Sequence, residues 1–273
     1  MQISVITPTH NRMALLEQLL NSLEQQTHTD FEVVIAVDGS TDGTLTLLEV
    51  IKRRAKLKLE VLVLPQGGQA RARNAAIKAA SGETLLFADD DLTFAPDVLA
   101  RHAAFHQVFK QSMAIGAVQY PNGKIDFPNN PSWINFTGMN TSLPKKAALE
   151  QNGFDENLSG YGGEDLEFAL RLEKSGLKIR RLADTLAFHA GEQIRNPKKA
   201  HSAGYQAVKI AQKYGDTVAM QLGVHPSLLA AKQLLLNPIG DVLLKSITDY
   251  AFERAYLNGA REAWKEIRNQ KSS

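Results

Sequence analysis

Hydrophobic residues follow two alternating spacings along the first third of the chain. Short apolar runs, typical of buried strands, alternate with segments in which apolar residues recur every three or four positions, as on one face of a helix. The expected strands are 3–7, 31–37, 59–64 and 84–88, and the helices between them are 13–25, 45–55 and 70–80. Such alternation is typical of right-handed βαβ crossovers. The pattern predicts an α/β fold with a mainly parallel central sheet flanked by helices.

The regularity weakens after a helix expected at 96–109. A proline- and asparagine-rich stretch, 121–133, reads as a loop. The other expected elements are strands at 113–120, 178–182 and 185–188, and helices at 145–151 and 164–175. Beyond Arg195 the strand pattern disappears, and 197–270 is expected to be helical, with breaks near Gly223, Pro226 and Pro238. We therefore expect an α/β domain over 1–195 and an all-helical extension over 196–273.

Composition excludes some classes of function. The 31 basic and 29 acidic residues give a net charge of +2 without a basic stripe, so no nucleic-acid partner is expected. Because the chain has no cysteine, a metal would need oxygen or imidazole ligands. The missing cysteines and the absence of a signal-peptide pattern fit a cytoplasmic protein. The longest apolar stretch, 228–244, is interrupted by polar residues and is not expected to cross a membrane.

Acidic residues follow two of the expected strands. Asp89, Asp90 and Asp91 come directly after 84–88, and Asp38 ends 31–37. The carboxyl ends of parallel strands share one edge of the sheet, where α/β proteins bind ligands. Adjacent carboxylates there suit a divalent cation bound with substrate phosphates. A solvated acidic turn, or an Asx turn at Asp38, is the alternative.

Two further positions carry candidate chemistry. Glu164 and Asp165 open a helix directly after Gly162 and Gly163, which suits either helix-start stabilisation or a general base beside a close substrate approach. His189 ends an expected strand and is a candidate imidazole ligand for Mn²⁺ or a similar ion.

At this point the motifs, taken in order, resemble the family-2 glycosyltransferases of the GT-A fold. The resemblance rests on 5–12, on 38–44, on 68–74 and on 82–96 with its Asp-Asp-Asp cluster. The segments 153–156 and 162–165, which read Gly-Phe-Asp-Glu and Gly-Gly-Glu-Asp, resemble the carboxyl-terminal module of β-1,4-galactosyltransferases and bacterial chondroitin-type polymerases. One departure is Val37, where many relatives carry a second acidic residue before the Gly-Ser turn. No family match reaches the helical tail.

The resemblance implies an inverting, metal-dependent hexosyl- or N-acetylhexosaminyltransferase that uses a nucleoside-diphosphate sugar, with UDP expected. The acceptor would be a hydroxyl of a glycan, a lipid-linked precursor or a cell-envelope polysaccharide. Residues 1–110 would form the nucleotide-sugar-binding half of a catalytic domain and 111–195 its acceptor half.

The resemblance also implies roles for single residues. Asp165 would be the base, with Glu164 orienting the acceptor, and Asp91 with His189 would bind Mn²⁺ or Mg²⁺. The nucleotide-sugar pocket would contain Thr7, Pro8, Thr9, Arg12, Asp38, Arg73, Asp89 and Asp90. The acceptor and donor-sugar pocket would be shaped by Trp133, Asn140, Tyr161, Gly162 and Gly163.

Other classes of protein stay open from the sequence. A nucleotidyltransferase would carry a lysine-containing, glycine-rich phosphate loop near its first strand, and a dinucleotide-binding oxidoreductase would carry GxGxxG there; 7–12 has no glycine. A non-catalytic nucleotide-sugar-binding or scaffold protein of polysaccharide assembly would keep the same motifs. The tail, 196–273, is expected to pack on the catalytic domain or a partner subunit, as in a homo-oligomer, or to attach peripherally to a membrane.

Overall fold

A computed structural model describes residues 2–158, 162–192, 196–235 and 250–272. The chain folds into two compact units. The first contains Met1–Glu156 and Phe168–Glu192, and the second contains Asn157–Glu167 and Gln193–Ser273. The sequence placed 157–167 in the α/β part, whereas in the structure this segment groups with the C-terminal helices.

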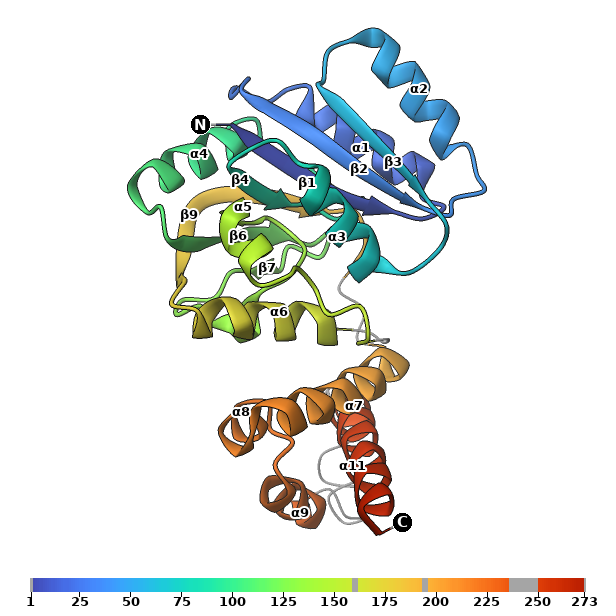
Figure 1. Cartoon of the computed structure of the whole chain (residues 1–273), viewed down its shortest axis with the longest axis vertical. Helices are drawn as coiled ribbons and strands as arrows, with labels where there is room; N and C mark the ends of the chain where they lie inside the picture. Colours follow the sequence, from blue (N-terminus) through green and yellow to red (C-terminus); the bar gives the residue numbers. More distant parts are fainter. Residues whose placement is uncertain (1, 159–161, 193–195, 236–249, 273) are drawn as a thin grey trace. The chain divides into compact units, whose positions relative to one another are not determined.

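Four parallel strands form one side of the sheet in the first unit, in the order β3-β2-β1-β4 (Figure 1). Their bounds are β1 Ile3–Thr9, β2 Phe31–Asp38, β3 Leu59–Leu64 and β4 Thr84–Phe87. Every residue of β1 and of β4 is buried, as expected for parallel strands covered on both faces. The expected βαβ arrangement is confirmed for this part.

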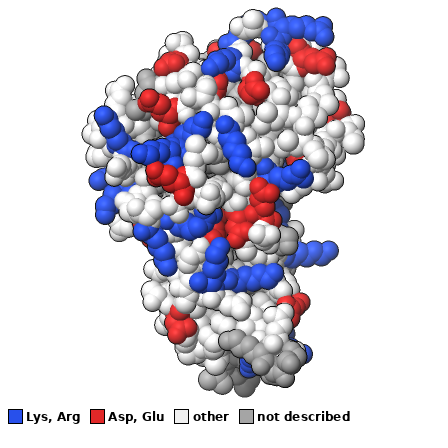
Figure 2. Space-filling model, in the orientation of Figure 1, with Lys and Arg blue, Asp and Glu red and all other residues white. Residues whose placement is uncertain are grey.

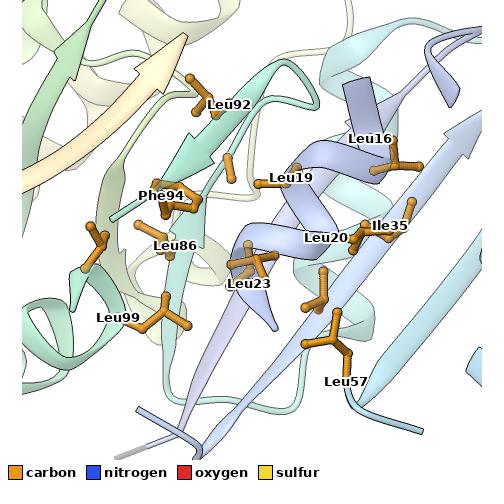
Figure 3. Close-up of a cluster of buried hydrophobic side chains, with 14 of the residues drawn as sticks. Leu16, Leu19, Leu20, Leu23, Ile35, Leu57, Leu86, Leu92, Phe94 and Leu99 are labelled. Carbon is orange, nitrogen blue, oxygen red and sulfur yellow. The ribbon is translucent and has the colours of Figure 1, made fainter. Parts of the chain in front are cut away.

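Helices cover both faces of these strands. The helices are α1 Met13–Leu23, α2 Thr44–Arg54, α3 Gln69–Ala79 and α4 Val98–Val108. Leu16, Leu19, Leu20 and Leu23 of α1 lie one helical turn apart and pack in the same buried cluster as Ile35 (Figure 3). Phe87, whose side chain lies outside this cluster, packs edge-to-face against three other phenylalanines, Phe136, Phe154 and Phe168.

The rest of the sheet is mixed rather than parallel. The sheet continues β4-β8-β6-β9-β5, where β8 pairs antiparallel with β4 and β6, β9 pairs parallel with β6, and β5 pairs antiparallel with β9. The added elements are β5 Leu92–Phe94, β6 Ser112–Gln119, β7 Ile125–Asp126, the 3-10 helix Trp133–Asn135, β8 Thr141–Pro144, α5 Lys145–Glu150, α6 Gly163–Lys174 and β9 Lys178–His189. The two strands expected at 178–182 and 185–188 are a single strand, β9, and its pairing with β6 shifts register between Ile115 and Ala117.

Basic and acidic side chains share the surface. On the face shown in Figure 2, Lys and Arg are interspersed with Asp and Glu, in keeping with the nearly balanced composition of 31 basic and 29 acidic residues. None of the described helices is both long and apolar enough to span a bilayer.

The second unit is helical over its described residues. It contains α7 Pro197–Tyr214, α8 Asp216–Gln221, α9 Pro226–Leu235 and α11 Tyr250–Ser272, with the expected breaks at Gly223 and Pro226 and a further one at Gly215. Pro238 lies outside the described residues. Helices α7 and α11 approach closely through two glycines, because a Cβ on Gly204 would collide with the carbonyl oxygen of Tyr256, and one on Gly259 with that of His201.

Substituting either glycine tests this close approach. Alanine normally favours a helix over glycine by about 1 kcal/mol. We nevertheless expect Gly204→Ala and Gly259→Ala to lower the free energy of unfolding by about 1–3 kcal/mol, because the added methyl group has no space. Urea denaturation followed by circular dichroism measures the change, with Gln212→Ala on the exposed face of α7 as control. Stabilisation by either glycine variant would contradict the close packing.

Candidate active site

The ends of β1 and β4 meet at one edge of the sheet. Thr9 Oγ1, in the last residue of β1, donates a 2.8 Å hydrogen bond to Asp90 Oδ2. Arg12, just before α1, donates from one guanidinium nitrogen to Asp90 Oδ1 and to Asp91 Oδ2, each at 2.9 Å. The side chains that the sequence placed at a common edge are thus held together by a hydrogen-bonded network.

Asp90 is the buried centre of this network. It is 4% exposed, and burial raises the pKa of its carboxyl group, while the bonds from Thr9 and Arg12 favour the charged form. Both of its oxygens already accept hydrogen bonds from the protein. In the structure Asp90 holds Thr9 and Arg12 in place, and the assignment of Asp90 to nucleotide-sugar binding stays a prediction.

Asp91 and His189 face each other across the pairing of β5 with β9. The two side chains approach to 3.5 Å, between Asp91 Oδ2 and His189 Nε2, and the Ala190 amide donates to the Asp91 carbonyl oxygen at 2.8 Å. His189 Nδ1 lies 2.7 Å from the Gly191 carbonyl oxygen, a shorter contact than the 3.0 Å to the Gly191 amide. The shorter contact favours a proton on Nδ1, which leaves the Nε2 lone pair on the side of Asp91.

These two side chains fit a divalent cation. Asp91 Oδ1 is buried and has no hydrogen-bond partner among the described residues, which is unfavourable for a carboxylate oxygen unless something else binds it. Carboxylate and imidazole are suitable ligands for Mn²⁺, and a backbone-oriented imidazole is the usual arrangement in metal sites. The described residues contain no group of three His, Cys, Asp or Glu arranged to bind a metal. Remaining ligands would therefore come from substrate phosphates and water.

Arg73 and Asp89 form the neighbouring ion pair. Arg73 is 2% exposed; its Nη2 donates to Asp89 Oδ1 at 2.8 Å and its guanidinium lies 5.3 Å from the centre of the Phe154 ring. Gln69 donates to the same Asp89 oxygen at 3.1 Å. The sequence expected Arg73 beside the base or diphosphate. The buried Arg73 side chain orients Asp89, while the expected contacts of Arg73 with the nucleotide and of Asp89 with the ribose stay predictions.

Asp38 anchors the loop that precedes α3. Its two carboxylate oxygens accept from the amides of Gly67 and Gly68 at 2.7 and 2.9 Å. Gly68 has a φ of 91°, which favours glycine. The sequence assigned Asp38 to the nucleotide base. In the structure its bonds define the position of the Gly67-Gly68 loop at the carboxyl end of β2, so a contact with a base would be additional to them.

Asn11 is a positioning residue that received no role from the sequence. It has a φ of 53°, and its side-chain oxygen accepts from the Thr41 amide at 2.7 Å and from the Asp42 amide at 3.3 Å. These bonds join the loop after β1 to the loop after β2, beside Arg12. The sequence signal for this role was an asparagine in the turn between β1 and α1, because asparagine adopts a left-handed backbone more readily than most residues and often bonds to backbone amides in turns.

Two residues expected in the sugar pocket are interior. Asn140 is fully buried; its amide donates to the Ala117 carbonyl oxygen at 2.8 Å, and its Oδ1 lies 3.0 Å from His102 Nε2. Trp133 is 1% exposed. The Asn140 side chain is enclosed and hydrogen bonded within the core, so it could shape a sugar pocket only from behind the pocket wall, and this role stays a prediction.

The remaining expected residues belong to α6 or come directly before it in the sequence. Tyr161 is outside the described residues. Glu164 and Asp165 lie in the first turn of α6, and Glu164 is 7% exposed. A Cβ on Gly163 would lie 2.8 Å from Gln206 Cβ, so this glycine admits a side chain of α7 at the place where the sequence expected substrate.

Two buried histidines, His102 beside Asn140 and His106 beside Ser142, predict a pH dependence of stability. Burial lowers the pKa of His102 to about 4, and burial together with the His102 charge lowers that of His106 to about 3. Both are neutral when folded, whereas the unfolded chain takes up protons below about pH 6.5. Stability is therefore complete above pH 6.5 and decreases as pH falls toward these lowered values.

When the pH falls from 7 to 5, we expect the free energy of unfolding to decrease by about 2 kcal/mol for each buried histidine. Urea denaturation at both pH values measures this loss. His106→Gln should reduce the difference between the two pH values, and His28→Gln, at a position that is only partly buried, should leave it unchanged. An equal pH effect in His106→Gln and wild type would contradict the interpretation.

The fold is that of a GT-A-like α/β protein. Residues 4–162, more than half of the chain, match the model described as Glycosyl transferase family 2. The chain belongs to this family.

Two curated relatives are similar over most of this chain. Poly(ribitol-phosphate) beta-N-acetylglucosaminyltransferase TarS of Staphylococcus aureus (strain Mu50 / ATCC 700699) is 32% identical over 230 residues, which cover 77% of this chain and 40% of the relative. Validoxylamine A glucosyltransferase of Streptomyces hygroscopicus subsp. jinggangensis (strain 5008) is 27% identical over 275 residues, covering 83% of this chain and 62% of the relative. The chain thus spans less than two thirds of the length of these relatives.

Two solved structures share the fold. The crystal structure of S. aureus TarS superposes with a TM-score of 0.63 at 25% identity, over 91% of this chain and 46% of that one. The mannosyltransferase PcManGT from Pyrobaculum calidifontis, solved in complex with GDP-Man and Mn²⁺, has a TM-score of 0.70 at 18% identity, over 96% and 86% of the chains. At that identity the second likeness concerns the fold alone.

Proposed function

We propose that this protein is an inverting glycosyltransferase that moves a sugar from a UDP-sugar to a hydroxyl of a cell-wall polymer or its precursor. The observation that carries the proposal is the buried Asp91 oxygen without a hydrogen-bond partner among the described residues, beside His189. Membership of glycosyl transferase family 2 supports the reaction class. A solved complex of TarS 1–349 with UDP-GlcNAc supports the donor class.

The acidic edge would serve the leaving group. Asp91 and His189 would bind a divalent cation, which when present acts as a Lewis acid on the departing diphosphate. Arg12 is half-exposed and already paired with Asp90 and Asp91, so its charge lies where the diphosphate becomes more negative. Asp89, oriented by Arg73, would accept a hydrogen bond from the ribose.

Asp165 would serve the acceptor. The acceptor oxygen forms a bond to the anomeric carbon while the bond from that carbon to the diphosphate oxygen breaks, and the acceptor proton passes to the Asp165 carboxylate. A single displacement of this kind inverts the anomeric centre. The position of Asp165 in the first turn of α6, and the resemblance of 162–165 to the galactosyltransferase Gly-Gly-Glu-Asp module, support this assignment.

Turnover tests the proposal against a non-catalytic binding protein. Purified chain would be incubated with Mn²⁺, a panel of UDP-sugars and polyol-phosphate or glycan acceptors, and UDP release would be measured. Acceptor-stimulated release supports an enzyme. Saturable UDP-sugar binding without release from any pair would instead favour a scaffold protein, which is the second candidate that the same motifs allow.

A further inference from the structure

A cavity lies at the opposite end of β4 from the acidic cluster. Its volume is about 660 Å³, within the range of small-molecule sites. The lining residues come from the segment before β4, the end of α4 and the junction of β8 with α5: Ser81, Gly82, Glu83, Thr84, His106, Lys110, Pro144, Lys145, Lys146, Leu149 and Glu150. Thr84 begins β4, whereas Asp89–Asp91 follow its end, so the two places are at different edges of the sheet.

A directed chain of hydrogen bonds runs toward this cavity. Because the Asn140 amide donates to the Ala117 carbonyl oxygen, its Oδ1 is an acceptor, and His102 Nε2 must donate to it. His102 is neutral, so its Nδ1 carries no proton and accepts from Ser142 Oγ at 2.7 Å. The single hydroxyl proton of Ser142 therefore points to His102 Nδ1.

The chain ends on an unsatisfied acceptor. His106 Nε2 lies 2.7 Å from Ser142 Oγ and must donate, because the Ser142 proton points to His102. His106 is neutral too, so its Nδ1 holds a lone pair. This atom is buried and has no hydrogen-bond partner among the described residues. A ligand in the cavity that offers a hydroxyl group could complete the chain.

Lysines supply the cavity with positive charge. Of the three that line it, Lys146 lies 3.7 Å from Glu150, and Lys145 donates to the carbonyl oxygen of Ala80 with one of its three N–H groups. Lys110 makes no ion pair with any residue that the structure describes. Three ammonium groups against two carboxylates, Glu83 and Glu150, favour an anionic ligand.

We propose that this cavity binds a small polyol phosphate: its phosphate lies among the lysines, led by Lys110, and one of its hydroxyl groups donates to His106. Pro144 and Leu149 contact its carbon chain. The ligand is either a free phosphomonoester or a phosphodiester-linked unit of a polymer, since both present a phosphate and a hydroxyl. The site is separate from the donor site of the proposed transferase and does not depend on it.

Calorimetric titration of the full chain with glycerol 3-phosphate tests the proposal, with UDP and Mn²⁺ present at saturation. Saturable binding is expected, and a diglycerol phosphodiester in a parallel titration shows which source is preferred. Lys110→Glu should weaken binding by about tenfold or more, since it places a carboxylate beside the phosphate. Lys52→Glu, the same change at an exposed position of α2, should leave binding unchanged.

The proposed contact between a ligand hydroxyl group and His106 is tested by comparing two anions, one with hydroxyl groups on a carbon chain and one without. His106→Phe should weaken glycerol 3-phosphate and leave inorganic phosphate unaffected, with circular dichroism confirming the fold. The proposal is overturned if neither phosphate ester binds, if they bind only when UDP is left out, or if Lys110→Glu and Lys52→Glu bind alike. Equal losses for both anions in His106→Phe would remove His106 from the site.

Discussion

Asp91→Asn is expected to lower sugar transfer by about 100-fold or more, the usual effect of removing one group that stabilises developing charge. The amide keeps the size of the carboxylate but removes its charge and weakens its binding of a hard cation. UDP binding measured by calorimetry should lose its dependence on Mn²⁺ in this variant. Asp30→Asn, at an exposed position before β2, provides the matched control.

The metal assignment fails if Asp91→Asn binds UDP with the same Mn²⁺ dependence as wild type. His189→Gln should show the same loss of metal dependence to a smaller degree, because the phosphates and Asp91 would still hold the ion. A loss of transfer with unchanged metal dependence would instead assign Asp91 to the positioning of Arg12, to which it is bonded at 2.9 Å.

Asp165→Asn is expected to lower transfer by about 1000-fold while UDP-sugar binding stays within about twofold of wild type. An asparagine cannot take the acceptor proton, but it preserves the hydrogen-bonding shape at the start of α6. The comparison separates catalysis from binding, because removal of a group that acts only in the transition state changes turnover and leaves ground-state affinity intact.

Glu173→Gln is the control for this prediction, since it neutralises an exposed carboxylate in the same helix. Donor hydrolysis without acceptor gives a second measurement, because water needs less assistance from a residue positioned for a particular hydroxyl. Full transfer by Asp165→Asn would move the search for the base to other carboxylates, with Glu164 first.

The parallel half of the sheet could be predicted because its signal is local. Strands β1 to β4 are short apolar runs, and helix α1 repeats its leucines at helical spacing. Strand β5 was missed since it has only three residues, and β8 since its four residues read Thr-Ser-Leu-Pro and lack the apolar run of the equally short β4. They exist through pairing with distant partners: β8 pairs with β4, and β5 pairs with β9.

The sequence predicted which residues lie at the candidate site better than it predicted what each of them does there. Acidic residues after two strands indicated a common edge, and Thr9 with Asp90 lies there. The roles of Asp38, Arg73 and Asp90 depend on partners far along the chain, such as Gly67 for Asp38. No spacing rule identifies those partners, so the sequence could not separate residues that hold others in place from residues exposed to a ligand.

The ion pairs of Arg12 with Asp90 and Asp91 bear on the stability of the protein when no metal is bound. A cluster of neighbouring carboxylates normally requires a bound cation to offset its own repulsion, and such a protein loosens when the cation leaves. Here the chain itself supplies a positive charge, because the Arg12 guanidinium, just before α1, pairs with Asp90 and Asp91. In the proposed transferase, loss of the metal together with the product would therefore leave the carboxylates still paired with Arg12, and we expect the fold to be retained without added metal.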